Sequence, residues 1–194
     1  MKKILSSIMV TATLFSCAPK KENGIEYSVD KFADLEVLRY EVPGFDELSL
    51  QQKKLVYYLS EAALQGRDIL FDQNGKWNLA IRRTLESIYT NYAGDRESDD
   101  FKAFELYLKQ VWFANGIHHH YATDKFTPRF SQSFFEEAVR SVDPSTLPLK
   151  PGKDVDALLN DLTPVIFNPS LLAKRVNQAD GEDLVLTSAG NYYD

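Results

Sequence analysis

The chain has 194 residues, of which 44% are hydrophobic and 12% aromatic, enough apolar material for the packed core of one domain. Its 28 acidic residues outnumber its 22 basic residues, and the formal net charge is −6. The composition excludes a disordered or fibrous chain, and we expect no nucleic-acid partner, because such partners usually demand a basic face.

Residues 1–17 have the pattern of a bacterial lipoprotein signal peptide. Two lysines precede an apolar run that is too short to span a membrane and fits the hydrophobic part of a signal. The run ends in Leu-Phe-Ser-Cys, and Cys17 is the only cysteine, so no intramolecular disulfide can form. We expect lipidation at Cys17 and a membrane-anchored protein of the bacterial cell envelope. The bulky Phe15 leaves simple secretion or an uncleaved anchor as alternatives.

A polar tether is predicted over residues 18–34. Apolar and polar residues then alternate from Leu35 to Val42, which predicts a half-buried strand. Ser49 and Gln52 have the spacing of a capping box, so a helix should begin there. The helical spacing of its apolar residues extends that helix to about Phe71.

A second helix is expected from about Leu79 to Tyr92. It carries Arg82 and Arg83, two guanidinium groups of the kind that can bind a substrate carboxylate. Pairing with a neighbour at helical spacing, such as Glu86, is the simpler interpretation. We therefore predict that both arginines are surface residues.

Two further helices are predicted from their first turns. Asp99 and Asp100 suit the first turn of a helix, where its dipole favours negative charge. Ser133 and Glu136 have the spacing of another capping box. The first of these helices carries an apolar stripe that we interpret as core: Phe101, Phe104, Leu108, Val111 and Trp112.

The last third of the chain predicts more helix and one strand. Asp154, Asp156 and Asp161 lie among leucines and read as the polar face of a helix, since the glycine and glutamate of a calcium loop are missing. Asn168-Pro169 predicts the start of a short helix. Leu184–Thr187 has the composition of a strand, and no partner strand follows within the chain, so we expect the fold to be incomplete as it stands.

The segment from Trp112 to Phe130, called here the 112–130 segment, passes from an apolar helix into a polar loop and is the predicted ligand-facing part of the chain. It holds all three histidines, His118, His119 and His120. Zinc sites on a helix place two ligands about one turn apart, whereas adjacent residues point in different directions. We therefore predict a solvated loop without bound zinc.

Five residues of this segment carry a family resemblance. Gly116, Tyr121, Lys125, Phe126 and Pro128 follow the helix with the spacing G-x-x-x-x-aromatic-x-x-x-K-F-x-P. This pattern resembles the N-terminal part of the dipeptidyl peptidase III family of zinc exopeptidases, which remove dipeptides from the N-terminus of oligopeptides.

The helix that opens at Leu48-Ser49 gives a second match. It contains Tyr57-Tyr58-Leu59-Ser60 and Ala62-Ala63, and it resembles the first long helix of that family. Together the two matches cover about residues 45–142. The C-terminal stretch rich in Thr, Ser and Asn is a weaker match to a strand region of the family.

The resemblance implies an α+β fold, predominantly helical with a few strands. Residues 35–194 would be the N-terminal portion of the lower lobe of a two-lobed metallopeptidase, incomplete without the zinc lobe that follows it. The family's zinc motif, His-Glu-x-x-Gly-His, does not occur in this sequence. We therefore expect this chain to hold no catalytic residue and no zinc, and to be inactive alone, with zinc bound by other residues in the full-length enzyme.

The resemblance also assigns one substrate-binding residue. The family's loop aromatic, which walls the pocket for the N-terminal dipeptide of the substrate, falls on Tyr121. The alternative is a tyrosine that packs the loop onto the helix ending at Trp112. An alternative for the whole chain is a non-enzymatic helical lipoprotein that binds a peptide or protein partner through the 112–130 segment.

Overall fold

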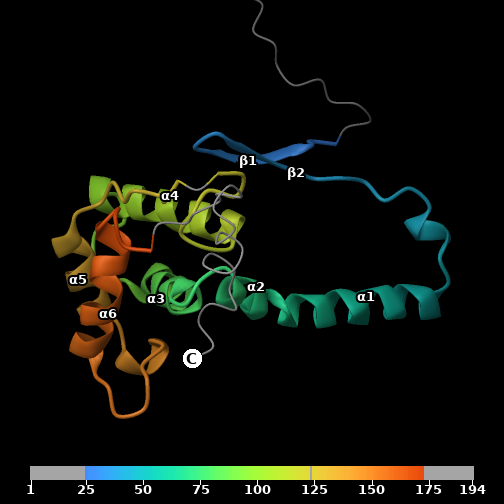
Figure 1. The fold of residues 1–194 in the computed structure, drawn as a ribbon. Coiled ribbons are helices and arrows are strands. Elements are labelled where there is room, and N and C mark those ends of the chain that lie inside the picture. The colour runs from blue at the N-terminus through green and yellow to red at the C-terminus, as the bar shows by residue number, and fades with distance from the viewer. Residues whose placement is uncertain (1–24, 123, 173–194) are drawn as a thin grey trace, which may run out of the picture. The chain divides into compact units, whose positions relative to one another are not determined.

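A computed structural model describes residues 25–122 and 124–172 of the chain. The chain divides into two compact units, with the boundary after Val42. Figure 1 shows the elements of both units. The predicted signal peptide with Cys17 and the predicted strand at Leu184–Thr187 lie outside the described residues.

The first unit contains a β-hairpin. Strand β1 (Ser28–Phe32) pairs antiparallel with β2 (Leu35–Leu38), and Ala33 takes a positive φ of 50° in the turn between them. The segment predicted as tether, residues 18–34, thus contains a strand, and the strand predicted to reach Val42 ends at Leu38. The composition concealed β1 because it has little apolar surface to bury, and hairpin hydrogen bonds hold it instead.

The second unit is helical, and the predicted class, α+β and predominantly helical with few strands, is confirmed. Its elements are η1 (Phe45–Glu47), α1 (Leu50–Gln65), α2 (Arg67–Gln73), α3 (Asn78–Asn91), α4 (Asp99–Ala114), α5 (Gln132–Ser141), η2 (Pro144–Thr146) and α6 (Val155–Phe167).

The capping box at the start of α1 is confirmed. The Gln52 N–H donates to Ser49 Oγ over 3.3 Å, and the Ser49 N–H donates back to Gln52 Oε1 over 2.9 Å. The single helix predicted to reach Phe71 is instead two helices that meet at Gly66. The Gly66 N–H bonds the Ala63 carbonyl in a tighter turn, which ends α1.

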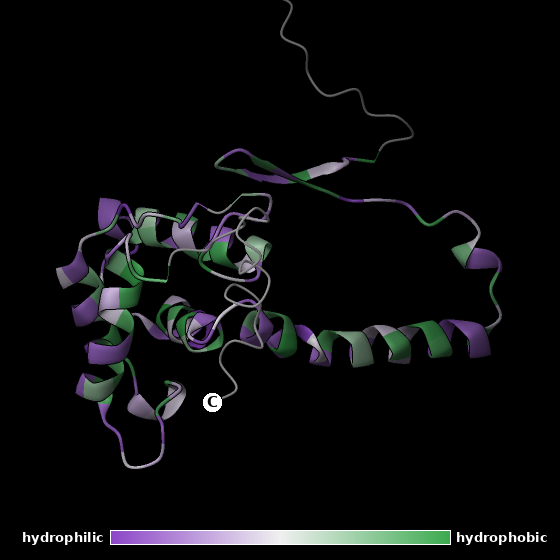
Figure 2. Ribbon diagram, viewed as in Figure 1, coloured by the Kyte–Doolittle hydropathy of each residue, from purple (hydrophilic) through white to green (hydrophobic). Residues whose placement is uncertain are grey.

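No side chain of α1 is buried. Figure 2 shows hydrophobic residues along the whole length of this helix. Because they lie on more than one side of it, α1 has no single polar face. Its large exposed apolar side chains are Leu50, Leu55, Val56, Tyr57, Tyr58, Leu59 and Leu64.

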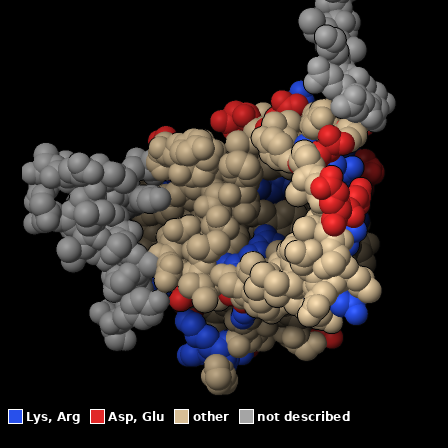
Figure 3. Space-filling view, turned by 90° about the vertical axis from the view of Figure 1, so that its right-hand side faces the viewer, with Lys and Arg blue, Asp and Glu red and all other residues tan. Residues whose placement is uncertain are grey.

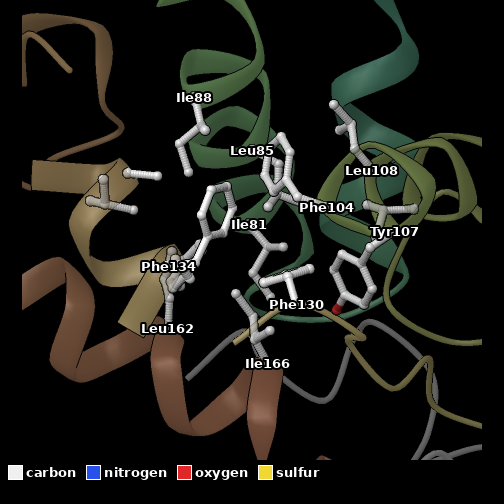
Figure 4. Close-up of a cluster of buried hydrophobic side chains, with 14 of the residues drawn as sticks. Ile81, Leu85, Ile88, Phe104, Tyr107, Leu108, Phe130, Phe134, Leu162 and Ile166 are labelled. Atoms are coloured by element: carbon white, nitrogen blue, oxygen red, sulfur yellow. The ribbon is translucent and has the colours of Figure 1, made fainter. Parts of the chain in front are cut away.

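Helices α3 to α6 enclose the hydrophobic core, which is rich in aromatic rings (Figure 4). The stripe predicted on α4 is core, with only Trp112 partly exposed. The ring centroids of Phe104 and Phe130 lie 5.8 Å apart in an edge-to-face contact, a favourable arrangement of aromatic quadrupoles. Tyr107 is also fully buried, its hydroxyl has no hydrogen-bond partner among the described residues, and burial raises its pKa.

The predicted start of α5 is wrong by two residues. Ser131, not Ser133, is the cap, and its Oγ accepts the Phe134 N–H over 3.1 Å. Asp100 on α4 selects this register, because its carboxylate accepts both the N–H and the hydroxyl of Ser131. Local spacing alone could not reveal a contact 31 residues away in the chain.

A helix is present where the three aspartates predicted a polar helix face, and it ends where another helix was predicted to begin. Asp154 caps its start by accepting the Ala157 N–H over 2.9 Å. Asn168 is the C-terminal cap of α6, and its side chain accepts the Ser170 N–H in a turn. The described residues after Pro169 are therefore turn, not helix.

Candidate functional site

The 112–130 segment starts where α4 ends. Asn115 takes the left-handed conformation, with φ of 54°, that ends many helices, and the Gly116 N–H bonds the Val111 carbonyl. The chain then turns away from the helix axis into a loop. The predicted change from apolar helix to polar loop at Asn115-Gly116 is therefore confirmed.

Two asparagines near the start of α3 fix this loop. Asn74 Nδ2 donates to the Asn115 carbonyl over 3.1 Å, and Asn78 Oδ1 accepts the Ile117 N–H over 3.2 Å. Asn78 is 2% exposed, and a Cβ added to Gly116 would lie 2.5 Å from its Nδ2 atom. Only glycine therefore fits at position 116 while Asn78 keeps its place.

The two arms of the loop pair with each other in the manner of a short hairpin. The Phe126 N–H donates to the Ile117 carbonyl, and the His119 N–H donates to the Asp124 carbonyl, both over 2.8 Å. Tyr121 lies between His119 and Asp124, at the tip of the loop.

Lys125 fastens the second arm to the end of α6. Its Nζ donates to the carbonyls of Asn168 and Leu171 over 2.8 and 2.9 Å. Burial lowers the pKa of the Lys125 ammonium, because desolvation disfavours the charged form. These bonds satisfy carbonyls at the C-terminal cap of α6 and in the turn that follows it, which is a structural task.

The three histidine side chains turn to different surroundings. His118 Nε2 donates to the Leu172 carbonyl over 2.7 Å, and His119 Nδ1 accepts the Tyr121 N–H over 3.2 Å. His120 Nδ1 is buried and has no hydrogen-bond partner among the described residues. Within residues 25–122 and 124–172 no three His, Cys, Asp or Glu side chains are grouped as metal ligands. The expected absence of zinc remains a prediction.

A polar hollow of about 260 Å³ lies beside the histidines. Asn74, Asn78 and the three histidines contribute its polar lining, and Phe113 contributes an aromatic edge. The Phe113 and His120 rings meet edge to face with centroids 4.8 Å apart. Imidazoles and amides together offer both donors and acceptors, so the hollow suits a polar group of a peptide.

Tyr121, the predicted substrate-binding residue, is 91% exposed. Its ring contacts His120, with centroids 4.2 Å apart, and does not pack onto the helix end at Trp112. It is not among the residues that line the hollow. The structure thus places Tyr121 open to solvent, beside His120 and outside the lining of the hollow.

Arg82 differs from its predicted surface position. It is 8% exposed, stacks on the Phe71 ring at 4.7 Å, and bonds Asp68 Oδ1 over 2.5 Å. The predicted pairing with Glu86 occurs at 3.4 Å. Arg83 bonds the other oxygen of Asp68. The hydrogen bond from Arg83, and to a smaller extent that from Arg82, lowers the pKa of the Asp68 carboxyl. The pair is therefore structural and joins α2 to α3.

Sequence reasoning missed Asn74 and Asn78, whose role depends on a contact some 40 residues along the chain. The one available signal was the glycine at position 116, since a glycine after a helix often marks a close backbone approach. Asn78 also precedes Leu79, the expected start of its helix, so the sequence did not show which helix face it occupies.

No family model matches the chain. The curated proteins likewise contain no match to it.

Among the described residues, no helix is long and apolar enough to cross a membrane. On the face shown in Figure 3, Lys and Arg occur in small groups between uncharged residues.

Proposed function

We propose that the chain is the N-terminal part of a dipeptidyl peptidase III-like zinc exopeptidase, and that the loop after α4 contacts the N-terminal end of an oligopeptide substrate. One observation carries the proposal. Of the residues that resemble the family motif, Gly116, Lys125 and Phe126 hold the loop, while Tyr121 is left 91% exposed at its tip. A motif that fixes a loop and presents one aromatic ring is suited to recognition.

The surroundings of Tyr121 support the same proposal. The polar hollow beside the histidines lies next to the loop tip and offers side-chain amides and imidazoles. A peptide whose apolar side chain covers the Tyr121 ring would have its polar backbone groups near these donors and acceptors. Under the proposal this chain supplies substrate contacts only, and zinc and the catalytic base belong to residues outside it.

Helix α1 supports the proposal that further polypeptide completes the enzyme. A helix with apolar residues on more than one side is typical of a helix that other polypeptide covers. Leu55, Tyr58 and Leu59 on α1 are 59%, 66% and 60% exposed. Contiguous exposed apolar surface of this kind marks an interaction site. We propose that the zinc-binding lobe, together with the remainder of the lower lobe, completes the enzyme, which is anchored in the bacterial envelope by lipid on Cys17.

The reading frame gives the first test. The DNA beyond the codon for Asp194 should encode His-Glu-x-x-Gly-His, in frame or after a frameshift. Its absence would contradict the proposal.

The protein that carries this motif gives the second test. Tyr121→Ala should weaken binding of dipeptidyl substrates by about 1–3 kcal/mol, the scale of one buried apolar contact. Zinc content and melting temperature should stay unchanged, because the side chain is exposed. Tyr40→Ala is the matched control, since Tyr40 is 78% exposed and lies in the other unit. Equal kinetics for the two variants would remove Tyr121 from the substrate site.

A second candidate is a non-enzymatic helical lipoprotein that binds a peptide or protein partner through the 112–130 segment. The observation that favours it is the closed core of α3 to α6, in which Phe104, Phe135 and Leu162 are all 0% exposed. Such a core is able to fold without further sequence. This candidate requires residues 18–194 to be monodisperse and to melt cooperatively, and aggregation or a molten profile would count against it.

A further inference from the structure

A second hollow, of about 370 Å³, lies between the start of α3 and the first turns of α6. Trp77 and Ala80 line one side, the segment Pro148–Lys150 another, and Asp154 to Asp161 a third. Its volume falls in the range of sites for small molecules. None of these residues belongs to the 112–130 segment, so this hollow is separate from the site described above.

One wall of this hollow is apolar. The half-buried Trp77 packs against the core and shares the lining with Ala80, Ala157 and the buried Leu158. Lys150 holds its ammonium over the Trp77 ring, 4.6 Å from the ring centroid. An indole beside small aliphatic groups is suited to a flat or branched apolar side chain.

The remaining lining carries both signs of charge. Lys150 Nζ lies 3.1 Å from Asp161 Oδ2, and Asp161 Oδ1 accepts no hydrogen bond from the described residues. Asp154 is engaged in capping α6. Lys153 lines the hollow too, and its ammonium has no ion-pair partner in the described part of the chain. An acceptor oxygen and an uncompensated cation therefore share one small hollow.

We propose that this hollow, the Trp77 hollow, binds a small zwitterion with an apolar body: an aromatic or branched amino acid, or a short peptide with both ends unblocked. The ammonium bonds Asp161, the carboxylate pairs with Lys153, and the side chain packs against the apolar wall beside the Trp77 ring. Charges of both signs beside an apolar wall match this ligand class.

The test uses the ¹⁵N-labelled 194-residue chain, which has two tryptophans and hence two indole N–H signals. Trp77→Phe assigns them, and Trp112→Phe gives the same assignment independently. During titration with L-phenylalanine we expect a saturable shift of the Trp77 signal and none of the Trp112 signal, which also reports that the fold is intact. N-acetylphenylalanine and phenylalanine amide, each lacking one charge, should bind about two- to fivefold more weakly than L-phenylalanine.

Variants locate the two charges. Lys153→Ala and Asp161→Asn should each weaken L-phenylalanine by about two- to fivefold, while the exposed Lys54→Ala on α1 should leave it unchanged. Tighter binding of the dipeptide Ala-Phe than of L-phenylalanine would identify peptides as the source, and the reverse order a free amino acid. No saturable shift with either compound, equal binding of the blocked compounds, or equal behaviour of Lys153→Ala and Lys54→Ala would overturn the proposal.

Discussion

Replacing Gly116 with alanine tests the close approach that shapes the candidate site. The new Cβ would lie 2.5 Å from Asn78 Nδ2, so the Asn78 side chain must move. Asn78 then loses its bond to the Ile117 N–H, and a buried donor left unpaired costs about 1–3 kcal/mol. The positive φ of 158° adds about 1–3 kcal/mol for a residue with a side chain, because few residues other than glycine adopt it. The free energy of unfolding should fall by about 2–6 kcal/mol in total.

Gly152 provides the matched control. Its φ is +73°, and no atom lies within 4 Å of an added Cβ, so Gly152→Ala carries the cost of a positive φ without a side-chain contact. Guanidinium unfolding followed by tryptophan fluorescence should separate the two variants by about 1–3 kcal/mol. In an Asn78→Ala background the excess cost at Gly116 should disappear, as a double-mutant cycle would show. Equal costs at the two glycines, or an excess that survives in that background, would refute the reasoning.

Three further predictions concern charge, burial and metal. The pKa of Asp68 is lower in the folded than in the unfolded chain, so its stabilisation is complete above the ordinary value of 3.8 and is lost as the pH falls through the lowered native value. Unfolding midpoints measured at successively lower pH should show this loss. In Asp68→Asn this part of the pH dependence should be absent. Tyr107→Phe should leave stability unchanged or raise it by up to about 1 kcal/mol in thermal melts, because it removes a buried hydroxyl without a described partner. Calorimetry should detect no stoichiometric zinc, and tight binding abolished by His119→Ala would contradict that expectation.

Local rules predicted the parts of the fold that local contacts decide. The capping box of Ser49, the acidic first turn of α4 and the buried stripe of Phe101, Phe104 and Leu108 all follow from spacing along one helix. These features depend on residues three or four positions apart, so a single sequence contains the whole signal.

Tertiary partners decided the rest. Asp100 moves the cap of α5 to Ser131, and Asp68 makes Arg82 part of the core instead of the surface. For the candidate site, the sequence indicated a polar loop after the helix, but the anchoring of that loop by Asn78 rests on a contact 39 residues away. Periodicity carries no information about such pairs.

The lack of buried side chains on α1 has a consequence for amide hydrogen exchange. A 16-residue helix without tertiary burial has little beyond its own backbone bonds and its capping box to hold it, which makes it marginal in water. Its amides should exchange through fraying and local opening, while those of α4 should require opening of the core. The boundary along the chain between fast-exchanging and slow-exchanging amides should fall near Gly66. A partner that covers α1 should protect its amides and move that boundary toward Ser49.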